Sequence, residues 1–207
     1  MMTLLIVLIT ALISYGAFQR HDVFDKLLLS PYRTFHQHQW YRMITHGFVH
    51  ADWVHLIINM LVLFSFGRSV ENIFLQLEGY GIIGNGKIVF VLLYLSGLVV
   101  ASLSSLLKHK DNRQYRSVGA SGAVAAVVFT HIFFQPWSKL YFWAILPIPG
   151  IVFGLLYLGY SHYMTRKQGH DNINHDAHFY GAVYGLIFPV LLEFDLITTF
   201  IEQLFPG

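Results

Sequence analysis

Three groups of polar residues lie inside or at the ends of apolar segments of the chain, where polar side chains are unusual. His55 and Asn59 are four residues apart in the second apolar segment, and a GASG sequence from Gly119 to Gly122 opens the fourth. His178 lies at the start of the sixth. Because a polar side chain is costly inside a bilayer, each group is a candidate for function.

The chemistry that these groups could perform together is acyl transfer by a serine. Ser121 lies at a predicted helix N-terminus, where free N–H groups and the helix dipole favour an oxyanion. A serine hydroxyl needs a base, which His178 can supply. His55 and Asn59 share one helical face and can both donate hydrogen bonds to that oxyanion. Each residue alone also fits a structural role, since such residues commonly link or pack membrane helices.

Six apolar segments must position these residues. Each approaches the roughly 17–25 residues that cross about 30 Å of hydrocarbon. They cover residues 4–18, 51–67, 88–107, 118–134, 150–164 and 177–194. The first segment lacks the basic start and the cleavage site of a signal peptide, so we expect a retained helix. Residues 196–205 predict a short amphipathic helix at the membrane surface.

The composition places these segments in a membrane. Hydrophobic residues make up 55% of the 207 residues, charged residues only 12%, and the mean hydropathy is +0.53. A soluble domain has about twice that charged fraction. The basic residues form no stripe, so nucleic acid is not an expected partner, and the absence of cysteine excludes disulfide and thiolate chemistry. The prediction is an all-α membrane protein, one domain over residues 1–207 with six transmembrane helices.

Glycine spacing predicts how the last helix packs. His178, Gly181 and Gly185 are three and four residues apart, so they line one helical face. The two glycines form a small-xxx-small surface that lets another helix approach closely. If that helix is the fourth, His178 comes within hydrogen-bond reach of Ser121.

The ordered set of motifs resembles that of the rhomboid intramembrane proteases. Trp40 and Arg42 are similar to the Trp-Arg signature of that family's first loop, although Tyr41 separates them, and Glu71 lies in a segment resembling the end of its second helix. The similarity runs from residue 40 to residue 185. The motifs are His46-x-x-x-His50-x-x-x-x-His55-x-x-x-Asn59, Gly119-Ala120-Ser121-Gly122 and His178-x-x-Gly181-x-x-x-Gly185.

This resemblance implies a serine endopeptidase that needs no metal and no other cofactor. Ser121 would be the nucleophile and His178 the general base and acid, and His55, Asn59 and the Ser121 N–H would form the oxyanion hole. Close helix packing and substrate access would depend on four glycines, and other residues would support the site. The glycines are Gly119, Gly122, Gly181 and Gly185, and the supporting residues are His46, His50, Trp40, Arg42 and Glu71.

The resemblance also implies partners and a location. The substrates would be transmembrane segments of other proteins, reached within the lipid bilayer by a multi-pass protein of the cell membrane. The fifth helix and residues 161–176 would act as gate and cap. The substrate, the cleavage site and the oligomeric state stay open.

Two features depart from the family pattern. Studied members often carry an aromatic residue one turn after the serine, where it stacks on the catalytic histidine, but this chain has Ala125. Another ring must then orient His178, with Phe129 and Tyr180 as candidates. In addition, loops one, three and five hold ten of the thirteen Lys and Arg residues. That count predicts a cytoplasmic site, whereas the family's usual topology, which we favour, puts this face outside.

Two other functions are possible interpretations of the same residues, a metalloenzyme and a non-enzymatic binding protein. A membrane metalloenzyme could use His46 and His50, or His175, Asp176 and His178, but the His-Glu-x-x-His pattern of metalloproteases is missing its glutamate. A catalytically inactive rhomboid-like protein would bind transmembrane clients without cutting them. Asp176 is expected to cap the sixth helix rather than to complete a triad with His178.

Overall fold

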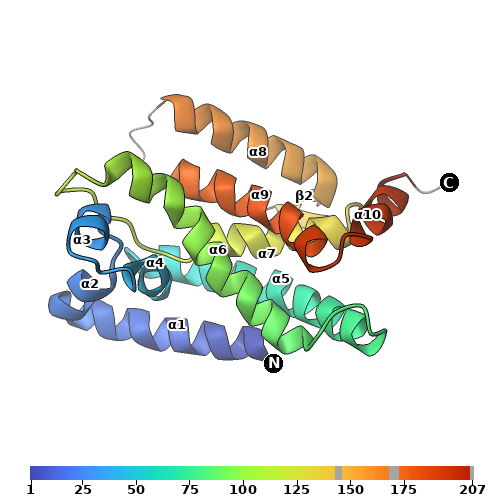
Figure 1. Cartoon of the computed structure of the whole chain (residues 1–207), viewed down its shortest axis with the longest axis horizontal. Helices are drawn as coiled ribbons and strands as arrows, with labels where there is room; N and C mark the ends of the chain where they lie inside the picture. The colour runs from blue at the N-terminus through green and yellow to red at the C-terminus, as the bar shows by residue number, and fades with distance from the viewer. Residues whose placement is uncertain (143–145, 168–172, 206–207) are drawn as a thin grey trace.

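Long apolar helices dominate the structure, a computed structural model that describes residues 1–142, 146–167 and 173–205 (Figure 1). A helix occurs at each of the six predicted segments. These helices are α1 (Met2–Gln19), α5 (Trp53–Gly79), α6 (Gly86–His109), α7 (Ser121–Phe134), α8 (Gly150–Lys167) and α9 (His175–Leu192).

The six helices differ in how well they suit a bilayer. Among the described residues, three helices are long and apolar enough to cross a membrane, namely α1, α5 and α6. The apolar α7 has only 14 residues. Both α8 and α9 have polar ends, with Arg166 and Lys167 closing α8 and with His175, Asp176 and His178 opening α9. The chain is therefore a helical membrane protein, and three of its helices meet the criteria of a full span.

Shorter elements fill the connections. The first loop contains four short helical elements: α2 (His21–Leu27), α3 (Pro31–His36), α4 (Arg42–Thr45) and a 3₁₀ turn (His46–Phe48). The predicted terminal helix is α10 (Leu196–Leu204). Two strands that were not predicted, β1 (Lys139–Phe142) and β2 (Leu146–Pro149), pair in an antiparallel arrangement.

A proline ends the second strand. Pro149 lies opposite Lys139, and α8 begins at the next residue, Gly150. A proline is tolerated at the end of an edge strand, because no ladder hydrogen bond is lost there.

The second long helix, α5, extends well past its predicted end at residue 67. Gly67 lies within α5 at a point where α1 approaches closely. A Cβ added to Gly67 would be 2.7 Å from Thr3 Cγ2. One turn on, the buried Glu71 carboxylate accepts hydrogen bonds from the N–H groups of Met2 (2.7 Å) and Thr3 (3.0 Å) and from the Thr3 hydroxyl (2.7 Å). Glu71 thereby satisfies N–H groups at the start of α1 that have no partner within that helix.

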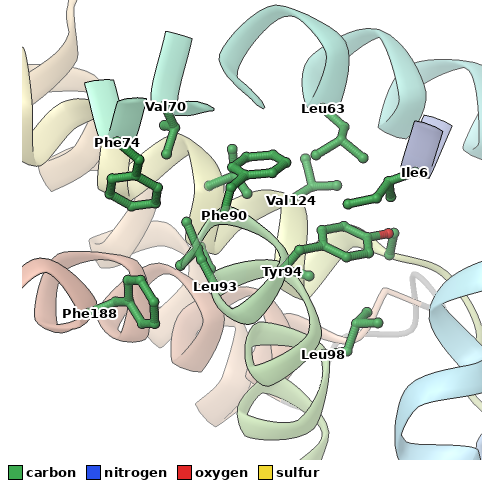
Figure 2. Close-up of a cluster of buried hydrophobic side chains, with 14 of the residues drawn as sticks. Ile6, Leu63, Val70, Phe74, Phe90, Leu93, Tyr94, Leu98, Val124 and Phe188 are labelled. Atoms are coloured by element: carbon green, nitrogen blue, oxygen red, sulfur yellow. The ribbon is translucent and has the colours of Figure 1, made fainter. Parts of the chain in front are cut away.

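The core surrounds α7, whose residues from Gly122 to Phe134 are all buried. In Figure 2, Phe90, Leu93, Tyr94 and Leu98 of α6 form the centre of one apolar cluster. Side chains from four other helices meet them there: Ile6 of α1, Leu63, Val70 and Phe74 of α5, Val124 of α7, and Phe188 of α9. In contrast, α8 lies at the edge of the bundle (Figure 1), and its buried residues are Gly150, Gly154 and Ser161.

Contacts between loops one, three and five hold one end of the bundle together. Leu29 and Ser117 exchange two backbone hydrogen bonds (2.9 and 3.1 Å). His36 Nε2 lies 2.9 Å from Asp111, and Lys108 Nζ lies 2.6 Å from the carboxylate of Asp176. These loops and the adjoining ends of α6 and α9 therefore lie on the same side of the bundle.

Candidate active site

A cavity of about 1060 Å³ opens at this end of the bundle. Its wall includes residues near the N-terminal ends of α5, α7 and α9, and their free N–H groups and dipoles favour negative charge there. All the residues predicted to perform chemistry line it, namely His55, Asn59, Ser121 and His178. Of the remaining predicted residues, His46, Gly119 and Gly122 also line the cavity.

Ser121 and His178 come together because the backbones of α7 and α9 are in contact. A Cβ on Gly181 would overlap the carbonyl oxygen of Gly122, and one on Gly185 would overlap that of Ala126. A Cβ on Gly122 would lie 3.1 Å from the carbonyl oxygen of Ala177, the residue before His178. The first turn of α7 therefore lies against the first turn of α9.

His55 and Asn59 face the cavity from the first turns of α5. The Asp52 side chain caps this helix by accepting the His55 N–H (2.8 Å). His55 Nδ1 accepts a hydrogen bond from the Ala51 N–H (3.5 Å), so its neutral ring carries the proton on Nε2. Asn59 Nδ2 donates to the His55 carbonyl (2.9 Å) and keeps a second hydrogen. Both side chains thus retain a donor for a ligand in the cavity.

Gly119 is needed in the turn that precedes Ser121. Its φ of +106° is rarely adopted by residues with a side chain. A Cβ there would also lie 2.7 Å from His55 Nε2. The glycine therefore provides a backbone conformation and leaves room for the imidazole.

His46 and His50 hold this turn from the first loop. The His46 carbonyl accepts the Gly119 N–H (2.9 Å), and His50 Nε2 accepts the Ala120 N–H (3.5 Å). The other nitrogen of His50 then carries the proton, and Nδ1–H donates to Ser14 Oγ (3.0 Å) of α1. The sequence motif identified both histidines as candidates. It did not show that they accept hydrogen bonds from the backbone before Ser121, or that Ser14 accepts a hydrogen bond from His50.

Burial keeps these two histidines neutral. Desolvation lowers the pKa of His46 to about 4. For His50, desolvation together with the nearby His55 and His46 lowers the pKa to about 3. Both rings are therefore neutral near pH 7, which suits the acceptor role of His50 Nε2.

Two rings lie 6.3 Å from the His178 ring between centroids, His175 in an edge orientation and Tyr157 of α8 in a stacked one. Tyr157 stacks on the imidazole with 6.3 Å between ring centroids and 20° between the planes, whereas Phe129 and Tyr180 were the predicted candidates. Phe129 instead packs against Tyr157 (5.5 Å). Gly154, one turn before Tyr157, lets α8 approach, since a Cβ there would lie 3.4 Å from Phe129. The sequence analysis missed Tyr157, because glycine spacing alone does not distinguish it from Tyr160 and Tyr163 of the same helix.

The remaining supporting residues act away from the cavity. Arg42 is buried, and its Nη1 donates to the carbonyls of Asp25 (2.8 Å) and Leu28 (2.7 Å), which fixes the fold of the first loop. Trp40 is exposed and makes an edge contact with Phe35 (6.3 Å between centroids). Glu71 joins α5 to α1, as described above.

Three predictions concerned residues at or near the start of α9. Asn174, not Asp176, caps the helix, since its side chain accepts the Ala177 N–H (3.1 Å) while Asp176 pairs with Lys108. Within the described ranges, no three His, Cys, Asp or Glu side chains are close enough to hold a metal ion. The gate expected at residues 161–176 lies partly outside the described residues, which omit 168–172.

Comparisons with known proteins identify the family of the chain. The Rhomboid domain matches residues 37–193. "RHOMBOID-like protein 12, mitochondrial" and "Rhomboid-like protein 11, chloroplastic", both of Arabidopsis thaliana, are 29% and 30% identical over 70% and 74% of this chain. "Rhomboid protease GluP" of Bacillus subtilis is 26% identical over 72% of it. The matches cover only 44%, 53% and 25% of those relatives. The chain belongs to the rhomboid family.

Proposed function

We propose that this chain is an intramembrane serine endopeptidase that cuts transmembrane segments of other membrane proteins. The observation that carries the proposal is that four side chains with complementary roles line one cavity beside three helix N-termini. A nucleophile, a base and two neutral donors are the parts that acyl transfer requires. A relative of this family is named a protease, which supports the same reaction class.

The proposed reaction starts with the attack of Ser121 Oγ on the carbonyl carbon of the scissile bond, while His178 takes the hydroxyl proton. The tetrahedral oxyanion accepts hydrogen bonds from the Ser121 N–H, from His55 Nε2–H and from the free hydrogen of Asn59 Nδ2. His178 then gives its proton to the leaving amine. A water molecule, activated by the same histidine, hydrolyses the acyl-enzyme and restores Ser121.

Helix α8 is the proposed route of access. It supplies Phe153 and Tyr157 to the cavity wall, yet most of its residues are not buried. Displacing it exposes less packed surface than displacing α7 or α9. We place the protein in the cell membrane as a multi-pass protein whose substrates arrive laterally from the bilayer.

Cleavage of a labelled transmembrane-segment substrate by the purified full chain tests the proposal. We expect cleavage that survives EDTA and falls by about 1000-fold or more in Ser121→Ala and in His178→Ala. Ser102→Ala is the matched control, because Ser102 lines the same cavity from α6 and its hydroxyl donates to the Val99 carbonyl. It should cleave like the parent.

Each other outcome identifies an alternative. Cleavage that persists in Ser121→Ala contradicts the proposed nucleophile. Inhibition by EDTA points to a metalloenzyme. Binding of substrates without cleavage by the parent, with Ala125 in place of the family's aromatic residue, identifies an inactive client-binding member.

A further inference from the structure

A second, smaller pocket lies beside the active-site end of the bundle, between α3 and the loop that joins α6 to α7. Its volume is about 320 Å³. Three of its five lining residues are arginines, and no carboxylate lines it: Tyr32, Arg33, Gln37, Arg113 and Arg116.

The positive charge of this pocket is only partly balanced. Arg33 Nη1 pairs with Asp25 (2.6 Å). In the part of the chain that the structure describes, Arg113 and Arg116 have no carboxylate within 4.0 Å. Three arginines less one aspartate leave two positive charges, which complement the single negative charge of a phosphodiester.

The arginines are held in place by contacts that leave donors free. The Arg113 guanidinium lies over the Tyr32 ring, 4.8 Å from its centroid. Arg116 Nη1 donates to the carbonyls of Arg113 (2.7 Å) and Tyr115 (3.0 Å). A guanidinium has five N–H donors, so each retains several for an anion. Planar guanidinium groups suit phosphate oxygens because two parallel hydrogen bonds can form.

Neighbouring side chains indicate at which depth of the membrane the pocket lies. Phe35, Trp40 and Tyr41 follow α3 or lie within it, and all three are exposed. Exposed aromatic residues gather at the headgroup level of membrane proteins. Lys110 Nζ lies 5.7 Å from the Phe35 ring centroid, which adds positive charge at this depth. An anion that reaches the pocket from the bilayer is therefore a lipid phosphate.

We propose that this pocket binds the phosphate headgroup of an anionic phospholipid. Arg116 lines both this pocket and the active-site cavity. A bound headgroup therefore touches the loop that leads, through Ser117 and Gly119, to Ser121. The site does not depend on proteolysis and can be tested on a catalytically silent protein.

Ligand-dependent melting temperature of the full chain in detergent provides the test. We expect short-chain phosphatidylglycerol to raise the melting temperature saturably, and short-chain phosphatidylcholine, which has no net charge, to leave it unchanged. Arg113→Gln/Arg116→Gln should weaken the apparent affinity about fivefold for each arginine removed. Arg166→Gln/Lys167→Gln removes two charges from the exposed end of α8 and is the matched control, with affinity unchanged.

Three results would overturn the inference. Equal stabilisation by inorganic phosphate alone assigns the pocket to a free anion. Stabilisation by an acidic peptide, but not by phosphatidylglycerol, assigns it to a polypeptide. An equal loss of affinity in both double variants shows that general charge, and not this pocket, attracts the lipid. Both variants change exposed side chains, so a melting temperature equal to the parent's without lipid verifies that they are folded.

Discussion

Two helices border the active-site cavity and are held in the molecule very differently. In α7, every residue after Ser121 is buried, and the backbone of α9 packs directly against it at Gly181 and Gly185. In α8, by contrast, the buried residues are Gly150, Gly154 and Ser161. The proposed nucleophile and base thus belong to a closely packed pair, while the helix that covers them has little packing to lose. Preorganised chemistry and substrate access are assigned to different helices.

The two helices are nevertheless linked through Tyr157. Its ring stacks on His178, so a movement of α8 removes a contact of the proposed base. In the family pattern described above, a residue of the nucleophile helix supplies this ring. Here we expect opening of the cavity and orientation of the base to be coupled.

The largest expected effect tests the difference in packing between the α7–α9 pair and α8. It comes from adding a methyl group to α9. Gly181→Ala and Gly185→Ala place a Cβ on the backbone of α7, and we expect a loss of about 3 kcal/mol or more in the free energy of unfolding. Gly159→Ala of α8 is the control, since no atom lies within 4 Å of its Cβ position. Helix propensity should make it neutral or up to about 1 kcal/mol more stable. Unfolding in detergent measures both, and equal losses would contradict the contrast.

The next effect is on the turn before α7. Gly119→Ala must strain a φ of +106° and displace the His55 ring. We expect a loss of about 100-fold or more in kcat, as for the removal of an oxyanion donor. Kinetics on the labelled substrate measure it. A variant with normal kcat would show that His55 has no role in stabilising the oxyanion.

Lowering the pH should reduce the free energy of unfolding through His46 and His50, which hold the turn before α7. The folded pKa values of His46 (about 4) and His50 (about 3) lie below the unfolded value, so the unfolded chain binds more protons as pH falls below about 6.5. Stability is therefore unaffected by these groups above that pH and is lost below it, by up to about 1.4 kcal/mol per pH unit for each histidine.

This pH dependence is measured by unfolding between about pH 6.5 and pH 5, above the range in which carboxylates titrate. His50→Gln removes one histidine and should reduce the slope by up to about 1.4 kcal/mol per pH unit. A slope that is the same in the variant and the parent would show that His50 is not protonated on unfolding.

The smallest effect concerns the ring on α8. Tyr157→Leu should lower kcat about 3- to 10-fold with little change in KM, because one aromatic contact is lost. Tyr157→Phe keeps the ring and should restore kcat. Tyr163→Leu replaces an exposed tyrosine of the same helix and should leave kcat unchanged. If all three variants behave alike, Tyr157 does not position His178.

The positions of the six main helices followed from the sequence because each contains an apolar run. The contact between α7 and α9 could also be foreseen, since Gly181 and Gly185 lie on one face with His178. The length of α5 could not, because the buried Glu71 is tolerated only where the first N–H groups of α1 donate to its carboxylate. Such a tertiary contact leaves no local signal.

The same limit applies to Tyr157 and to the strand pair. The apolar α8 has no periodic pattern that shows which tyrosine faces inward, and the candidates Phe129 and Tyr180 were chosen from α7 and α9. Strand β2 contains two prolines, Pro147 and Pro149, which disfavour a strand in sequence reasoning. Asn174 and Asp176 are both good helix caps, and only the ion pair with Lys108 decides between them.

The most direct test of the central claim is covalent labelling by a fluorophosphonate, a reagent that reacts with serines activated by a base. The label should appear on Ser121 of the parent, as located by mass spectrometry of its peptides, and should persist in Ser102→Ala. It should be lost in Ser121→Ala and in His178→Ala, which has the serine but no base. Labelling of Ser121 that is undiminished in His178→Ala, or labelling at another serine, would contradict the dyad.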